Sequence, residues 1–202
     1  VGGCVRDELL GLESKDIDFS VVLDDTSLSI DEGWDTMIGW LESKGFKLFL
    51  KTKDCFTVRG MFPKGHINEG LVGDFVLSRK EIGVIPGTRK PILELGTLED
   101  DLRRRDFTVN SLCKDEDGKI IDLFGGVEDL KKGVLKTPLD PMVTLLDDPL
   151  RMLRGLRFSI TKGFIIHNKL WDCMFDPRVL SKLKEVVSHE RMREEVTKMM
   201  KH

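Results

Sequence analysis

Apolar and polar positions in the first half of the chain form short runs that are separated by polar and glycine-containing turns. Residues 4–10 are typical of a short helix, and residues 16–23 alternate polar and apolar side chains with the period of a half-buried strand. Within residues 31–44 the apolar side chains fall at i, i+3, i+4 and i+7, which predicts an amphipathic helix packed on a sheet. Further apolar runs predict additional strands of one mixed sheet, at residues 46–50, 55–62 and 71–77.

The pattern changes twice further along the chain. Glycine and proline interrupt residues 79–96, where Lys and Arg also appear, so we expect a long mobile loop there. Beyond about residue 141 the strand-like runs stop and apolar residues recur at helical spacing. The pattern therefore predicts an α+β protein, with a mixed β-sheet flanked by helices over residues 1–141 and an all-helical domain over residues 142–202.

Composition narrows the class of protein. Hydrophobic residues make up 40% of the 202 residues, which favours a packed protein over a disordered one. No apolar stretch approaches the ~20 residues that span a bilayer, and the first thirty residues lack a charged segment followed by an apolar one. The cysteines form no CxxC pair and the histidines have no ligand spacing, which disfavours zinc and redox motifs. We expect free thiols and a cytoplasmic protein that contacts no membrane, with an organellar or viral origin left open.

The net charge of −3, taken alone, argues against an anionic partner, because phosphate binding favours a basic excess. The charges are, however, unevenly distributed. Residues 1–142 hold 20 Lys and Arg against 27 Asp and Glu, and residues 143–202 hold 12 against 8. The total is therefore uninformative, and the second part of the chain is the part suited to a nucleic acid.

Asp16 and Asp18 are two residues apart in a predicted strand, so both carboxylates project from the same face. Two adjacent hard oxygen donors are what Mg²⁺ requires, and without a cation their repulsion is costly. Asp74 adds a third carboxylate if its strand lies beside the first. The alternative interpretation is a solvated strand edge without a metal.

Gly2 and Gly3 lead into the first predicted helix, which carries Arg6 in its first turns. A backbone without side chains, a helix start and a guanidinium together suit a polyphosphate, although a glycine pair is also a common structural turn. With the aspartate pair on the next strand, the arrangement indicates phosphoryl or nucleotidyl transfer.

Several motifs resemble those of the tRNA nucleotidyltransferase and bacterial poly(A) polymerase family, within the DNA polymerase β superfamily. The sequence GGCVRD at residues 2–7, followed by DID at 16–18, resembles motif A. RRDFTVN at 104–110 resembles motif B, and DLFGG at 122–126, continuing to Asp129 and Leu130, resembles motif C. The resemblance implies a nucleotidyltransferase head and a helical neck, with the family's body and tail after Lys201 and a further strand before Val1.

For motif B the resemblance implies that Arg105, Asp106 and Asn110 contact the ribose and phosphates of the incoming nucleotide. Without that context, the run of three arginines at 103–105 reads as a solvated basic segment. The glycines at 125–126 read as a simple turn.

DDPLR at residues 147–151 resembles motif D, which implies that Asp148 and Arg151 form the protein template that selects CTP or ATP. The family has Glu where this chain has Asp147. A carboxylate and a guanidinium together can read cytosine or adenine and reject uracil and guanine. Pro149 also suits the first position of a helix, so Asp148 is expected as its N-cap, and Gly155 is expected to leave open space for a base.

SHERMREE at residues 188–195 resembles motif E, a structural element of the neck, and we expect Met192, Val196 and Met199 in the core. The loop at 79–96 occupies the place of the family's flexible loop, whose presence favours full CCA addition.

The resemblance therefore implies a template-independent enzyme that adds C and A from CTP and ATP to the 3′ end of tRNA. Asp16 and Asp18 are the expected catalytic residues that hold Mg²⁺, and tRNA is expected along the basic helical part at Arg154, Lys182 and Lys184. Open alternatives are CC-adding, A-adding or poly(A) polymerase activity, or a non-catalytic RNA-binding remnant. The oligomeric state stays open.

Overall fold

The computed structural model describes residues 1–14, 17–84 and 91–201. The chain separates into two compact units, residues 1–102 and 103–202, which are described separately below. The sequence pattern placed the domain boundary at residues 141 and 142 instead, and that boundary stays a prediction. All four cysteines are free thiols. Within the described ranges, no helix combines the length and the apolar character that crossing a membrane requires.

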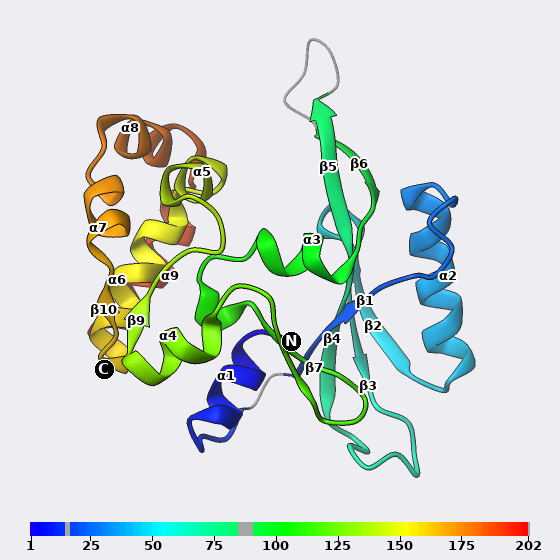
Figure 1. Cartoon of the computed structure of the whole chain (residues 1–202). Helices are drawn as coiled ribbons and strands as arrows, with labels where there is room; N and C mark the ends of the chain where they lie inside the picture. The colour runs from blue at the N-terminus through cyan, green and yellow to red at the C-terminus, as the bar shows by residue number, and fades with distance from the viewer. Residues whose placement is uncertain (15–16, 85–90, 202) are drawn as a thin grey trace. The chain divides into compact units, whose positions relative to one another are not determined.

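The first unit is a mixed sheet with helices around it (Figure 1). Its four-stranded sheet has the order β1-β4-β3-β2, in which β1 runs parallel to β4 and the other pairs are antiparallel. This confirms the predicted mixed sheet. The elements of the unit are α1 (Gly3–Leu9), β1 (Ile17–Val21), α2 (Ile30–Ser43), β2 (Lys47–Thr52), the 3₁₀ turn η1 (Lys53–Cys55), β3 (Thr57–Met61), β4 (Val72–Leu77), β5 (Arg79–Val84), β6 (Pro91–Leu95) and α3 (Leu98–Arg103).

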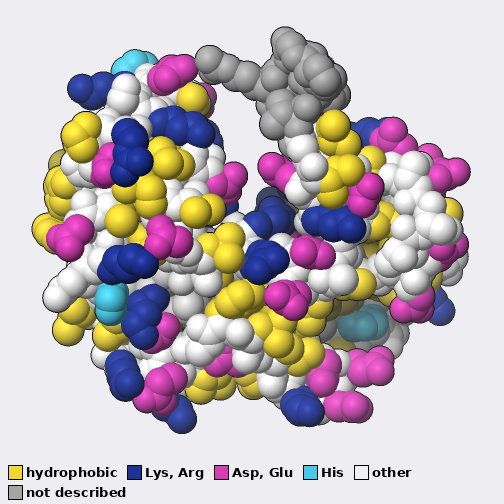
Figure 2. Space-filling model, turned by 45° about the horizontal axis from the view of Figure 1, so that its top comes forward, with side chains coloured by type: hydrophobic (Ala, Val, Ile, Leu, Met, Phe, Trp, Pro, Cys, Tyr) yellow, Lys and Arg dark blue, Asp and Glu magenta, His cyan; other side chains and the backbone are white. Residues whose placement is uncertain are grey.

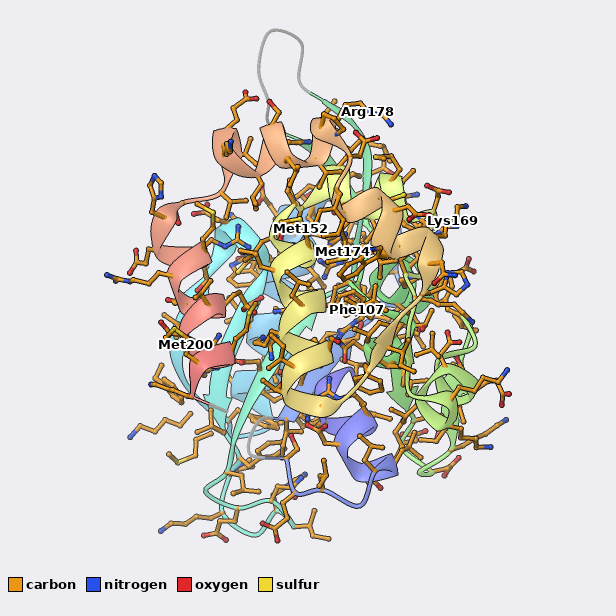
Figure 3. The ribbon with its side chains drawn as sticks, turned by 90° about the vertical axis from the view of Figure 1, so that its left-hand side faces the viewer. Phe107, Met152, Lys169, Met174, Arg178 and Met200 are labelled. Carbon is orange, nitrogen blue, oxygen red and sulfur yellow. The ribbon has the colours of Figure 1, made fainter. Side chains whose placement is uncertain are left out.

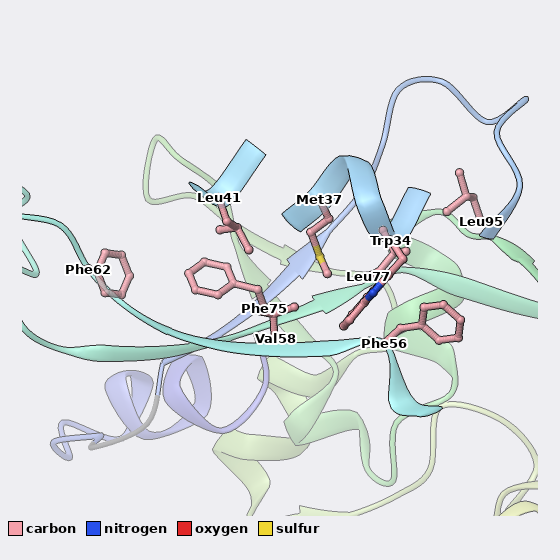
Figure 4. Packing of buried hydrophobic residues seen from close by; sticks show 9 residues of the cluster. All are labelled: Trp34, Met37, Leu41, Phe56, Val58, Phe62, Phe75, Leu77 and Leu95. Carbon is pink, nitrogen blue, oxygen red and sulfur yellow. The ribbon is translucent and has the colours of Figure 1, made fainter. Parts of the chain in front are cut away.

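Helix α2 covers one face of this sheet through its apolar stripe (Figure 4). Ser29 caps the helix, accepting a hydrogen bond from the Glu32 N–H while the Glu32 carboxylate accepts one from the Ser29 N–H. Buried side chains from α2, the strands and the η1–β3 turn then form one core, made by Trp34, Met37, Leu41, Phe56, Val58, Phe62, Phe75, Leu77 and Leu95. Because alternate residues of β1 and β4 point into this core, the residues between them lie on the opposite face.

The predicted loop at 79–96 is wrong for the residues that the structure describes there. Residues 79–84 and 91–95 are the antiparallel strands β5 and β6, and residues 85–90 lie outside the described part. Gly83 and Pro91, which the prediction took as interruptions, belong to these strands. Gly83 lies at an irregularity in the strand register, and Gly96 lies so close to Arg79 that a Cβ atom would come within 2.6 Å of its backbone. Both glycines accommodate the strand pair.

The second unit is mostly helical from residue 141 onward, as the apolar spacing predicted. The spacing did not predict the short strand β10, which pairs with β9 in parallel. The elements are the 3₁₀ turn η2 (Thr108–Asn110), β7 (Leu112–Lys114), β8 (Ile120–Asp122), α4 (Gly126–Lys132), β9 (Val134–Leu135), α5 (Pro141–Asp147), α6 (Leu150–Lys162), β10 (Ile165–Ile166), α7 (Asn168–Met174), α8 (Pro177–Val186) and α9 (His189–Met200).

Helix α6 is the centre of this second unit. Its Phe158 ring contacts Phe107 edge-on, and Phe107 and Met174 are fully buried beside it (Figure 3). The amphipathic spacing of α6 therefore packs the segment around Phe107 against the helical part of the unit.

The predicted core of α9 is wrong in one position. Val196 is 43% exposed, Met192 and Met199 are half-buried, and the buried residue of the helix is Glu195. The reason is an ion pair, because Glu195 accepts a hydrogen bond from Arg157 of α6. A paired carboxylate is tolerated in the interior, so Glu195 occupies the buried position beside the exposed Val196.

Candidate functional site

Asp18 and Asp74 lie side by side on the first unit's sheet. They are register partners on the parallel strands β1 and β4, so both project from the face opposite the α2 core. The sequence left it open whether the two strands are neighbours, and the structure shows that they are. Asp16 lies outside the described residues. The described part of the chain holds no group of three metal-ligating side chains.

Asp74 already has a cationic partner. Arg59, its register partner on β3, donates hydrogen bonds from Nε to Oδ1 at 2.7 Å and from Nη2 to Oδ2. The donor chemistry of Asp18 and Asp74 fits a divalent cation, since both supply hard carboxylate oxygens. Any such cation would share Asp74 with Arg59.

Around Gly2 and Gly3, the Arg6 guanidinium is folded back onto its own helix. It is buried and donates two hydrogen bonds to Asp7, at 2.9 and 2.8 Å. A Cβ atom on Gly3 would lie 3.5 Å from the Arg6 guanidinium, an ordinary contact distance, so Gly3 packs beside this side chain. The Val1 ammonium donates to the Asp18 carbonyl at 2.6 Å and ties this segment to β1. Phosphate binding by Gly2, Gly3 and Arg6 stays a prediction.

In the second unit, Asp106 is the centre of a buried polar network. Its Oδ1 accepts hydrogen bonds from the Phe107 N–H at 2.8 Å and the Asn110 amide at 2.9 Å. Its Oδ2 accepts one from Arg154 of α6 at 2.8 Å. Burial alone raises the pKa of Asp106, but the Arg154 charge and these hydrogen bonds outweigh it and hold the pKa below its ordinary value. The same pairing raises the pKa of Arg154 against the effect of burial.

This network makes a testable contribution to stability. The pKa of Asp106 is lower in the folded state than in the unfolded state, where it is about 3.9. The ionised carboxylate therefore stabilises the fold at pH values above about 3.9, and this stabilisation is lost as the pH falls through the folded-state pKa. We expect Asp106→Asn to lower the free energy of unfolding by about 2 kcal/mol at pH 7, with the partial exposure of Arg154 limiting the loss. Urea unfolding at pH 7, 5 and 3 measures the difference. A difference that stays the same at pH 3 would contradict the assignment.

The predicted template residues lie at the start of α6. Arg151 is mostly buried and donates to the Thr144 carbonyl at 3.1 Å and the Arg104 carbonyl at 2.7 Å, and it pairs with Asp147 at 2.9 Å. Asp147, which stands where the family has Glu, thus still pairs with Arg151. The bond to Arg104 connects α6 directly to the segment that resembles motif B.

The helix is assigned from Leu150 with Pro149 at its N-cap, one residue later than expected. The Asp148 Oδ1 nevertheless accepts the Leu150 N–H at 3.1 Å, which is the hydrogen bond expected of a capping carboxylate. One expectation for this helix needs correction. Gly155 leaves no open space, because it is buried and a Cβ atom there would meet the Phe107 ring at 3.4 Å. Gly155 packs against the segment that resembles motif B.

The segment that resembles motif C has a structural role that sequence reasoning missed. The Asp122 carboxylate accepts hydrogen bonds from backbone N–H groups at the start of α4, including Gly126 at 2.8 Å. Thr108 donates to Asp129 at 2.8 Å, and Lys136 pairs with the same carboxylate. The sequence DLFGGVEDL at residues 122–130 could have predicted this role, since an Asp that precedes a glycine pair and a helix is a capping arrangement.

The residues expected to contact RNA differ in their surroundings. Arg154 is held by Asp106, and Lys182 donates to the Leu146 carbonyl at 2.5 Å, whereas Lys184 is exposed. On the face that Figure 2 shows, basic and acidic side chains are interspersed. Lys184 is therefore the member of this set that is best placed to meet a phosphate.

Residues 1–136 match the family model described as the poly A polymerase head domain. The chain belongs to the tRNA nucleotidyltransferase and poly(A) polymerase family. It is 34% identical to the tRNA nucleotidyltransferase cca2 of Schizosaccharomyces pombe, over 99% of this chain and 42% of that protein. It is 33% identical to the nucleotidyltransferase lcsQ of Purpureocillium lilacinum, over 99% of this chain and 35% of that protein.

Solved structures of this nucleotidyltransferase family support the same fold. The CCA-adding enzyme of Bacillus stearothermophilus in complex with CTP superimposes with a TM-score of 0.73 at 26% identity, over 98% of this chain and 43% of that one. The Thermotoga maritima CCA-adding enzyme complexed with tRNA gives 0.71 at 28% identity, over 99% of this chain and 42% of that one. The chain thus spans less than half the length of these relatives. The fold prediction of a nucleotidyltransferase head with a mixed sheet and flanking helices is confirmed.

Proposed function

We propose that this nucleotidyltransferase adds C and A from CTP and ATP to the 3′ end of tRNA. The observation that carries the proposal is the template pair at the start of α6, where Arg151 is anchored to the carbonyl of Arg104. Base-reading and sugar-reading segments are therefore parts of one compact unit. Relatives named as CCA-adding enzymes or tRNA nucleotidyltransferases support the choice of substrate.

Each segment has its own task in this proposal. Asp148 accepts a hydrogen bond from the exocyclic amino group of cytosine or adenine, and Arg151 donates to the neighbouring ring acceptor. Arg105, Asp106 and Asn110 orient the ribose and phosphates. The backbone at Gly2 and Gly3, with Arg6, contacts the triphosphate.

Asp16 and Asp18, with Asp74, would hold Mg²⁺, which when bound stabilises charge on the attacking and leaving oxygens. The 3′-hydroxyl of the RNA attacks the α-phosphate of the nucleotide, and pyrophosphate leaves. The protein's part is positioning, since phosphoryl transfer needs little covalent chemistry from side chains.

The test is incubation of the chain with tRNA that lacks its CCA end, supplied with CTP, with ATP, and with both. CCA addition predicts extension with CTP and a further residue only when ATP is also present. Extension limited to CTP, extension with ATP alone by one residue, or a long ATP-dependent tail would indicate CC-adding, A-adding or poly(A) polymerase activity, respectively. A non-catalytic RNA-binding remnant would give no extension and no Mg²⁺-dependent thermal shift with CTP.

The placement of tRNA makes a separate prediction. Lys184→Gln is expected to weaken tRNA binding about two- to threefold at low salt and to reduce the salt dependence by about one phosphate contact. Fluorescence anisotropy at several salt concentrations measures both quantities. Combined neutralisation of Arg154, Lys182 and Lys184 with unchanged tRNA affinity would contradict this placement.

A further inference from the structure

The Asp148 carboxylate has a second partner outside its own helix. Arg191 of α9, which lies 43 residues further along the chain, donates from Nη2 to Asp148 Oδ2 at 3.2 Å. Oδ1 of the same carboxylate accepts the Leu150 N–H at 3.1 Å. Each oxygen is therefore tied to one donor, and the two bonds together fix the direction in which the plane of the carboxylate faces.

Arg191 is itself held by the local fold of α9. Ser188 caps this helix and accepts a hydrogen bond from the Arg191 N–H at 3.3 Å. The buried pair between Arg157 and Glu195 joins α9 to α6 one turn further on. The arginine thus stands on a rigid element, which is the condition for holding another group in a defined geometry.

The pair is too exposed to be explained by stability. The Arg191 and Asp148 side chains are 52% and 31% exposed, and ion pairs at such sites contribute little to folding. The exposure does leave room for a ligand. A carboxylate has about four acceptor sites, two of which are taken by Leu150 and Arg191, so acceptor capacity remains for the amino group of a base.

Arg151 has partners other than Asp148. Its guanidinium donates to the Thr144 and Arg104 carbonyls and pairs with Asp147. The two base-reading groups are therefore held by separate partners, and the bond from Arg191 is the one that ties the Asp148 carboxylate to α9.

We propose that Arg191 is a positioning residue for base selection, which holds Asp148 so that it accepts from bases with an exocyclic amino group and rejects uracil and guanine. This inference rests on the proposed function. It gives the segment resembling motif E a role in nucleotide choice in addition to its structural role in the neck.

The test compares Arg191→Gln with Arg193→Gln, which removes the same charge from an exposed position two residues away on the same helix. We expect Arg191→Gln to lower the ratio of kcat/KM for CTP to that for UTP about tenfold, through a higher KM for CTP. Arg193→Gln should leave the ratio unchanged. Arg191→Lys, which keeps the charge but loses the planar fork, should recover part of the ratio.

Two further measurements separate positioning from a structural effect. Titration calorimetry with CTP and UTP should show the same loss of discrimination at equilibrium, with the melting temperature of Arg191→Gln within about two degrees of the unchanged chain. In an Asp148→Asn background, Arg191→Gln should have no additional effect on discrimination.

The outcomes distinguish the two proposals. If the unchanged chain binds and incorporates CTP in preference to UTP, and Arg191→Gln keeps the ratio of Arg193→Gln, the role of Arg191 is overturned and the proposed function stands. If the unchanged chain shows no preference for CTP and ATP in either assay, the proposed function fails and the inference fails with it.

Discussion

Asp18→Asn is expected to abolish nucleotide incorporation while CTP still binds. The substitution keeps the shape of the side chain but removes the charge that is proposed to hold a divalent cation beside Asp74. Metal ions supply several kcal/mol of transition-state stabilisation, and each 1.36 kcal/mol is tenfold in rate, so the loss should be at least about 10³-fold. The residues proposed to contact the base and the sugar belong to the second unit, so the dissociation constant for CTP without metal should change less than about threefold.

The matched control is Asp24→Asn, at an exposed position shortly after β1. It should keep full incorporation. Incorporation by Asp18→Asn at a rate within tenfold of the unchanged chain would contradict the assignment of Asp18. Equal loss in both variants would show that the effect comes from the charge of the segment, not from the metal-facing carboxylate.

Gly126→Ala is expected to have the largest effect on stability among the glycine substitutions in the second unit. A Cβ atom at this position would lie 2.1 Å from the Thr108 carbonyl oxygen and 3.0 Å from Leu112. Overpacking of this kind costs up to about 3 kcal/mol, because a backbone oxygen is less able to move away than a side chain. The free energy of unfolding from urea titration measures the loss.

The neighbouring Gly125→Ala is the control. No atom lies within 4 Å of a Cβ at Gly125, but its φ is +74°, so we expect only the conformational cost of about 1–2 kcal/mol. Equal effects of the two substitutions would contradict the close contact between Gly126 and Thr108. This contact joins the segments resembling motifs B and C, which explains why the glycine pair is more than a turn.

The helix α2 and the strands beneath it could be predicted from the sequence because the spacing of their apolar residues follows the period of a helix or a strand. Trp34, Met37 and Leu41 recur at helical spacing and are buried, and the strands beneath them alternate. The pattern did not predict the described strands within residues 79–96, because glycine and proline usually mark loops. Here Gly83 lies at an irregularity in the strand register, and Gly96 allows a close approach to the backbone of Arg79. In α9, the spacing of apolar residues does not predict that Glu195 is buried, because its burial depends on the hydrogen bond from Arg157 of α6.

In the candidate site too, some features could be predicted from the sequence and others could not. Spacing alone placed Asp18 on a strand face, and the resemblance supplied the roles of Asp106, Asp148 and Arg151. The partners of these residues were not predictable from local sequence. Arg154 reaches Asp106 across 48 residues and Arg191 reaches Asp148 across 43, and only the fold brings such positions together.

The most direct test of the proposed activity is the mass of the RNA 3′ end after the chain acts on tRNA without CCA in the presence of all four nucleotides and Mg²⁺. Competition among the four nucleotides tests catalysis and base selection in one reaction. The proposed function predicts that two C residues and one A are added and that extension then stops. RNA that binds the protein but gains no mass, or that gains U and G as readily as C and A, would contradict it.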